Sequence, residues 1–231
     1  MVEALLATLR QLPHDRWPSL LDQFCSSGDL QAHLNDVLLD GNKLDEMTRK
    51  SFYHPTGGYK LVLASDGYDG PELRLHIWPT GSNIGREHNS YSVHNHKWSF
   101  ASRIVRGSFM EQIFIESTDA ANESYDRYKF DSRVRGEEYE SGFVGRRFLT
   151  RLFCGPMLAG AAYEQASETL HSFEPSTESL SVTLFARTRY IASHTDVYVP
   201  AGRHIILDSQ GPNCIDAAMM RQLLDLVRHA L

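Results

Sequence analysis

The distribution of helix and strand patterns along the chain is the feature that most limits its fold. From Tyr59 onward, apolar residues recur at every second position in short segments separated by glycine-rich turns. Helical spacing is confined to residues 2–39 and 215–231. Helices that are gathered at the chain ends, and do not alternate with strands, argue against a doubly wound α/β sheet. We therefore predict an all-β fold, a small jelly-roll barrel flanked by N-terminal helices and a C-terminal helix.

The chain is long enough for one domain, in which we expect three parts. Residues 1–50 form a helical flank, residues 55–207 the barrel, and residues 214–231 the closing helix. Residues 40–56 are polar and expected to be irregular. Strands are predicted over Tyr59–Ala64, Glu72–Trp78, Phe100–Val105, Phe109–Glu116, Arg147–Phe153, Leu180–Ala186, Tyr190–Val199 and His204–Leu207. Residues 117–144 are expected to form a hairpin or surface excursion, and residues 173–179 a turn.

The composition limits the partners and the compartment. A formal charge of −6 and a pI near 6.0 argue against a general nucleic-acid or anionic-membrane surface. The longest apolar runs are too short to cross a bilayer, and the N-terminus lacks a signal-peptide pattern. Three widely spaced cysteines without a Cys-x-x-Cys pair fit a reducing cytoplasm better than a disulfide scaffold.

Two histidines, His94 and His96, precede a segment rich in aromatic and branched residues that ends at Gly107. On an extended chain, side chains two residues apart point to the same side, so one metal ion can bind both imidazoles. A third histidine, His171, follows a short rise from the turn at Gly160. Any one of the 11 histidines is more often a surface or hydrogen-bonded residue than a ligand, but these three together indicate a metal site.

These segments resemble the two motifs of the cupin superfamily, over about residues 55–190. The histidine pair and Gly107 match the first motif, with Phe100 at the position of its acidic ligand. Gly160 and His171 have the spacing of the second motif, although its proline and glycine are replaced. The resemblance implies a jelly-roll barrel that holds a metal ion inside it.

The resemblance makes His94, His96 and His171 the metal ligands. Three neutral imidazoles leave the full 2+ charge of a divalent ion on the site, whereas two imidazoles and a carboxylate leave 1+. With Phe100 in place of the acid, this charge favours an anionic, chelating ligand such as a thiolate or carboxylate. Three protein ligands also leave coordination positions open, as in catalytic sites. Fe(II) is the expected metal, and zinc, nickel, manganese and copper are the alternatives.

Among cupins, this arrangement is most similar to the three-histidine thiol dioxygenases of the cysteine dioxygenase type. That family carries a helper histidine and a tyrosine where this chain has Thr183 and Phe185. Phe185 cannot donate a hydrogen bond, and the family's carboxylate-binding arginine falls near Lys60 or Leu61. The resemblance therefore implies iron and dioxygen chemistry without identifying the substrate.

Two predicted strands each carry one purely apolar row and one mixed row. Alternation alone leaves two orientations: the apolar rows fill the barrel, or the mixed rows line a cavity. A tryptophan precedes the metal loop in the dioxygenases, and its match to Trp78 favours the mixed rows as the cavity lining. The mixed rows contain Arg74, His76 and Trp78 on the first strand, and Ser181, Thr183, Phe185 and Arg187 on the second.

In that orientation, Arg74 or Arg187 would bind a substrate carboxylate through two hydrogen bonds. His76 would be catalytic, as a second-sphere acid/base or hydrogen-bond donor. The residues expected to complete the substrate pocket are Trp78, Phe100, Thr183 and Phe185.

We therefore expect an iron(II)-dependent oxygenase of dioxygenase type, acting on a small carboxylate-bearing metabolite such as a thiol or amino-acid derivative. Two other classes fit the same residues. One is a cupin that binds a small molecule without redox chemistry, and the other is a metal-assisted isomerase or lyase. The expected partners are substrate and dioxygen, with no nucleic acid and no membrane, and exposed barrel edges are consistent with a homodimer.

Overall fold

The computed structural model describes residues 1–54, 57–67, 69–81, 92–131, 140–176, 178–203 and 213–231. Within these ranges, helices lie at both ends of the chain and strands lie between them. The helices are α1 (Val2–Gln11), the 3-10 helix η1 (His14–Arg16), α2 (Trp17–Ser26), α3 (Asp29–Leu39), α4 (Gly41–Lys50) and α5 (Ala217–Arg228). The strands are β1 (Phe52–His54), β2 (Gly58–Ser65), β3 (Glu72–Trp78), β4 (Val93–His94), β5 (Phe100–Arg106), β6 (Ser108–Ser117), β7 (Glu123–Asp131), β8 (Glu140–Leu158), β9 (Ala162–Gln165), β10 (Leu170–Pro175), β11 (Ser181–Arg187), β12 (Thr195–Pro200) and β13 (Asn213–Cys214).

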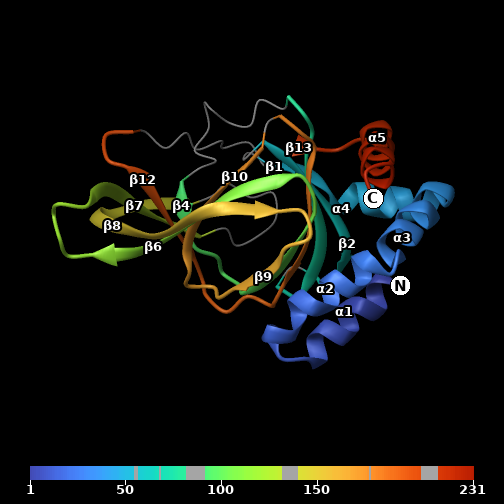
Figure 1. Cartoon of the computed structure of the whole chain (residues 1–231), viewed down its shortest axis with the longest axis horizontal. Helices are drawn as coiled ribbons and strands as arrows, with labels where there is room; N and C mark the ends of the chain where they lie inside the picture. The colour runs from blue at the N-terminus through green and yellow to red at the C-terminus, as the bar shows by residue number, and fades with distance from the viewer. Residues whose placement is uncertain (55–56, 68, 82–91, 132–139, 177, 204–212) are drawn as a thin grey trace.

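The strands form two antiparallel sheets (Figure 1). The first sheet has the order β13-β1-β2-β3-β11-β5-β9. The second has the order β10-β4-β12-β7-β8-β6 and closes on itself because β6 also pairs with β10. This mostly-β, jelly-roll-like architecture with helices at both ends confirms the predicted fold class.

The helices cover one face of the first sheet, on the right in Figure 1. Leu73, Leu75 and Ile77 of β3 are fully buried, and they share one core cluster with helix residues such as Leu9 and Leu21. Burial of this apolar row supplies the hydrophobic contact that holds the helices to the sheet. The apolar row of β3 therefore packs under the helices, and its mixed row faces the other way.

The opposite face of the first sheet packs against the second sheet. Trp78 and Ile104 of the first sheet cluster with Phe109 and Phe173 of the second. The ring centroid of Trp78 lies 5.2 Å from that of Phe109 and 5.6 Å from that of Phe173. Gly58 leaves room for the indole, since a Cβ atom at that position would lie 2.5 Å from Nε1 of Trp78. The mixed rows thus line the space between the two sheets.

The prediction of irregular structure over residues 40–56 is wrong, because helix α4 and strand β1 lie there. The Asp40 side chain caps α4 by accepting hydrogen bonds of 2.9 and 3.3 Å from two backbone N–H groups of its first turn. The buried residues of α4 are Leu44 and Met47, so its apolar stripe is narrow and its sequence reads as polar. None of the helices in the described ranges combines the length and apolar character that a membrane crossing needs.

The second sheet contains a long hairpin over the region of residues 117–144, where a hairpin or a surface excursion was predicted. Strands β7 and β8 pair from Glu123↔Leu149 to Asp131↔Glu140. Strand β8 continues to Leu158, well beyond the strand predicted over Arg147–Phe153. Pro156 is tolerated in this extension because the pairing of β8 with β7 ends at Leu149. Beyond that residue one edge of β8 has no described partner strand, and an N–H group is not needed on that side.

Two other predicted boundaries need correction. Strand β10 continues to Pro175, into residues that were predicted to form a turn, because it pairs with β6 as far as Phe109. Strand β12 begins only at Thr195, whereas the predicted strand began at Tyr190. The strand predicted over His204–Leu207 lies outside the described residues.

Candidate metal centre

The three predicted ligands come together in the structure. His94 ends β4, His96 lies in the segment that follows, and His171 lies on β10. The Nε2 atoms of His96 and His171 are 3.0 Å apart. One ligand atom from each of the three residues lies within 4.8 Å of the other two. These side chains therefore form a group that is able to hold a metal ion.

Two of the rings are oriented through their Nδ1 atoms. Nδ1 of His94 lies 3.0 Å from the backbone oxygen of Ser92. Nδ1 of His171 lies 3.0 Å from Oε1 of Glu111 on β6. Both partners are acceptors, so each Nδ1 carries the proton and each Nε2 keeps its lone pair for a metal. The tautomer that a metal site needs is therefore set by the surrounding chain.

His96 is fixed by different contacts, because its residue lies outside a strand. Its backbone N–H donates to the oxygen of Ser167, at 3.0 Å. Its ring stacks on Trp98 with the centroids 5.3 Å apart and the planes 21° from parallel. The ring is thus held by packing on one face while its Nε2 points to His171.

The electrostatic surroundings keep two of the ligands, His94 and His96, neutral. Burial, helped by repulsion from His171, lowers the pKa of His94 to about 3. Burial also holds the pKa of His96 well below its usual range, together with the neighbouring histidines and the cations Lys60 and Arg74. Neutral imidazole is the form that binds a metal, so both side chains are ready to bind at neutral pH.

The spacing of the donor atoms fits one ion. Two imidazole nitrogens at about 2.1 Å from a shared metal lie about 3 Å apart at a right angle and at most about 4.2 Å apart. The distance between His96 and His171 already matches the shorter value. The outer limit of 4.8 Å for the whole group means that binding would draw the rings slightly inward.

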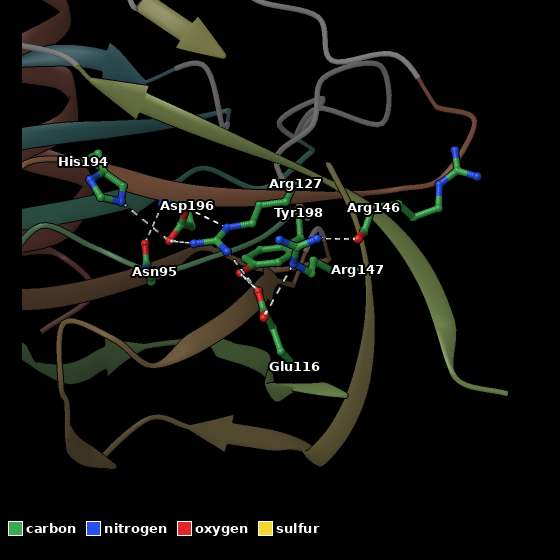
Figure 2. Close-up of polar contacts among 8 residues, drawn as sticks. All are labelled: Asn95, Glu116, Arg127, Arg146, Arg147, His194, Asp196 and Tyr198. Atoms are coloured by element: carbon green, nitrogen blue, oxygen red, sulfur yellow. Dashed lines mark hydrogen bonds and ion pairs between the residues drawn. The ribbon is translucent and has the colours of Figure 1, made fainter. Parts of the chain in front are cut away.

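A polar network holds the residue between the first two ligands (Figure 2). The backbone N–H of Asp196 donates to Oδ1 of Asn95 at 2.7 Å, and the N–H of Asn95 donates to the oxygen of Asp196 at 3.1 Å. The Asp196 carboxylate accepts two hydrogen bonds of 2.9 Å from Arg127. Arg127 and the Tyr198 hydroxyl both donate to Glu116, at 3.4 and 2.6 Å. The ligand segment is therefore tied to β12, β7 and β6.

Aromatic rings continue from the ligands into the space between the sheets. The Phe100 centroid lies 5.2 Å from that of His96 and 5.7 Å from that of His171. Phe185 lies 4.8 Å from Phe100, and His76 lies 4.7 Å from Phe185. Phe100 and Phe185 therefore connect the three histidines to His76 through ring contacts.

The two predicted carboxylate-binding arginines share one buried glutamate. Glu72 is in contact with Nε of Arg74, and its Oε2 lies 3.2 Å from Nη2 of Arg187. Arg187 is 1% exposed, and its guanidinium lies 5.0 Å from the Trp98 ring and 4.9 Å from the Tyr190 ring. Two guanidinium groups therefore converge on one carboxylate inside the barrel. The positive charge of Arg74 also acts on the three histidines, since it contributes to the lowered pKa of His96.

The remaining predicted pocket residues lie on the same inner rows. Thr183 is paired in register with His76 on one side and with Ile104 on the other. Trp78 belongs to the apolar cluster with Phe109, and its ring lies 5.8 Å from His76. The catalytic role predicted for His76 and the substrate contacts predicted for these residues stay predictions.

The similarity of this chain to known proteins is confined to solved structures of low sequence identity. No protein-family model matches it, and no curated protein matches it. Solved structures similar to it include an RmlC-like cupin from Shewanella frigidimarina, at 11% identity over 59% of this chain and 79% of the other, with a TM-score of 0.33. KdgF from Halomonas is 12% identical over 58% of this chain and 82% of its own, with a TM-score of 0.32. A protein of unknown function with a cupin-like fold from Ralstonia eutropha is 12% identical over 79% and 82%, again with a TM-score of 0.32. The candidate site therefore rests on the geometry described above.

Three further residues near the centre were not predicted as site residues. Glu111 and Gln165 are buried beside His171, and Lys60 acts electrostatically on His94. Glu111 was detectable in principle, since it occupies an inward position of the predicted strand Phe109–Glu116 where an apolar residue is usual. Gln165 lies on β9, a strand too short to stand out by alternation.

Proposed function

We propose that this chain is a metal-dependent oxygenase of the dioxygenase type, with Fe(II) held by His94, His96 and His171. Its substrate would be a small carboxylate-bearing metabolite, such as a thiol or amino-acid derivative. The observation that carries the proposal is the convergence of three imidazoles, two of them with pKa values lowered by burial, with Phe100, and no acid, at the position of a fourth ligand. Such a site leaves coordination positions open and favours an anionic chelating substrate.

Bound iron would supply the redox chemistry and the activation of dioxygen. The chain itself would bind and orient the substrate. Arg74 would bind the carboxylate with its guanidinium, which Glu72 holds in place through Nε. Lys60 would add a second positive charge, since it already influences both His94 and His96. These two cations lie on neighbouring strands, β2 and β3, of the first sheet.

The inner aromatic row would exclude water from the reacting groups. Phe100 and Phe185 lie between the ligands and His76, so an apolar part of the substrate would pack against them. His76 would then donate a hydrogen bond or exchange a proton at the substrate end remote from the ligands. His76→Gln should lower turnover while leaving the metal content unchanged.

The first test is the metal content of protein purified without added metal, compared with the His96→Ala variant. We expect close to one equivalent of iron in the parent and little in the variant. A different stoichiometric metal that is lost in the variant would move the chemistry toward an isomerase or lyase. Absence of metal in both, with none taken up on incubation, would refute the enzyme and leave a binding module.

The second test is dioxygen uptake by the iron-loaded protein with a panel of small thiols, amino acids and other carboxylates. Once a substrate is found, Arg74→Gln should raise its KM by about 10–100-fold, since a charge-assisted hydrogen bond contributes about 1.5–3 kcal/mol. Arg106→Gln is the matched control, because Arg106 ends β5 in an exposed position. Turnover without dioxygen uptake would exclude the oxygenase, and an unchanged KM would exclude Arg74 as the carboxylate-binding residue.

A further inference from the structure

The third ligand has a buried carboxylate behind it. Glu111 is 3% exposed and lies on β6, with its side chain between the sheets. Its Oε1 atom is 3.0 Å from Nδ1 of His171, on the side of the ring opposite the nitrogen that faces His96. The β6–β10 register pairs Glu111 with Phe173, so Glu111 and His171 are diagonal neighbours on one face of the sheet. The contact is therefore fixed by strand pairing.

A second side chain holds the carboxylate in this position. Nε2 of Gln165, on β9, donates to the same Oε1 atom at 2.6 Å. Gln165 is 6% exposed, so the whole group of three side chains is removed from solvent. The other carboxylate oxygen, Oε2, has no hydrogen-bond partner among the described residues. Burial of a carboxylate with so few partners is costly unless a positive charge lies close to it.

The charge on Glu111 reaches the surroundings of the ligands. Tyr163, which lies next to Phe100, has its pKa raised by burial and additionally by Glu111. A divalent ion at Nε2 of His171 would supply the compensating positive charge through the imidazole. Glu111 would in turn make that imidazole a stronger donor to the metal.

We infer that Glu111 is a positioning residue for the metal centre. Through its contact with Nδ1 of His171 it supplies a negative charge next to the ligands, whereas Phe100 beside them is uncharged. This role rests on the proposed metal site. The Glu111 carboxylate would lower the net charge of that site. Three neutral histidines alone leave 2+ on a divalent site, and the carboxylate behind His171 brings the local sum to 1+, as in a site with a directly bound acid. The centre therefore combines open coordination positions with a lowered charge.

The test compares Glu111→Gln with the parent. Glutamine keeps the size and an acceptor oxygen but removes the charge, so the fold should be preserved. We expect Co(II) affinity, measured by competition with a chromophoric chelator, to fall by about 10–100-fold, as for other outer-shell partners. The ligand-field absorption of bound Co(II) should also shift, and the Fe(III)/Fe(II) potential of the iron-loaded protein should rise. A purely structural role would not move the last two readouts.

Glu174→Gln provides the matched control, because Glu174 lies on β10 with its side chain exposed. Gln165→Met is the second variant, since it removes the donor to Glu111 without touching His171. It should shift the same readouts in the same direction by a smaller factor. If Glu111→Gln fails to fold, Gln165→Met decides the question.

The outcomes separate the two proposals. A parent protein that takes up no Co(II) and no iron refutes the metal site itself. A parent that binds metal, with Glu111→Gln or Gln165→Met unchanged in affinity, spectrum and potential, refutes the role of Glu111 and leaves the metal site in place. Loss of affinity in Glu174→Gln as well would show a general effect of surface charge and would also overturn the inference.

Discussion

His94 and His171 are register partners on the antiparallel strands β4 and β10. Strand β4 contains two residues, and on its other side Val197 of β12 is also paired with His94. A ligand on such a short strand would be poorly fixed by its own strand alone. Its position therefore depends on both neighbouring strands.

Replacement of His171 by alanine should abolish metal-dependent stabilisation. A metal present at 100 times its Kd stabilises a protein by about 2.7 kcal/mol, which corresponds to a rise in Tm of about 5–10 °C for a domain of this size. We expect this rise in the parent and in His229→Ala, whose histidine is exposed at the end of α5. Scanning calorimetry with and without Co(II) measures it, and a rise that persists in His171→Ala would exclude that residue as a ligand.

Arg127→Met should weaken both the fold and the metal centre. The substitution leaves the carboxylate of Asp196, which is 7% exposed, without its two-bond partner. Loss of one member of such a pair costs about 3–5 kcal/mol when it is fully buried, and less here because the Arg127 side chain is 20% exposed. Because Asp196 also binds Asn95, Co(II) affinity should fall with stability.

The control for this change is Arg146→Met on the same hairpin. The Arg146 side chain is 61% exposed and pairs with Asp126 at 3.0 Å, an ion pair of the kind that contributes about 0–1 kcal/mol. Urea unfolding of the three proteins gives the comparison. Equal losses of stability in both variants would mean that the contacts of Arg127 and Asp196 in Figure 2 do not hold the ligand segment.

Gly58→Ala should destabilise the protein although β2 has ordinary extended geometry there. The added methyl group would meet the Trp78 indole at 2.5 Å, and overpacking of this kind costs about 1–3 kcal/mol. Gly41→Ala, at the start of α4, meets nothing within 4 Å and should be neutral or slightly stabilising. Urea midpoints and the near-ultraviolet circular dichroism of tryptophan report the two effects, and an unchanged midpoint in Gly58→Ala would contradict the described packing of Trp78.

The stability of the metal-free protein should fall on acidification. The pKa of His94 is lowered by burial from 6.5 to about 3, so between these values the unfolded chain binds a proton that the native state does not. The free energy of unfolding therefore rises with pH through this window and levels off above about pH 6.5. His94→Gln should have a shallower dependence between about pH 3 and pH 6.5. Identical slopes for the parent and the variant would show that this histidine is not buried neutral.

The sequence was most informative where periodicity and burial agree. The strand predicted over Glu72–Trp78 matches β3 because its aliphatic residues face the helices, whereas the alternate residues, Trp78 among them, face inward. The three histidines were recognisable because their spacing met two separate motifs. Helix α4 was missed because its two buried residues are surrounded by polar ones, and tertiary contact with α3, α5 and β2 stabilises it.

The contacts around the ligands were less accessible from the chain alone. Glu111 is separated from His171 by 60 positions, and their contact depends on the β6–β10 register, which no local pattern specifies. The shared use of Glu72 by Arg74 and Arg187 likewise follows from pairing of β3 with β11. Local pattern thus identified the reactive groups, and long-range strand pairing decided which of them are neighbours.

The placement of His94 between β10 and β12 has a consequence for the order of folding. The first two ligands are near neighbours along the chain, but they acquire their final geometry only when strands from residues 170–175 and 195–200 have docked beside them. Contacts of such long sequence separation form late, because the loops that they close cost the most entropy. A nascent chain would therefore expose an incomplete ligand pair until most of the polypeptide has left the ribosome, and uptake of metal would mark the end of folding rather than initiate it.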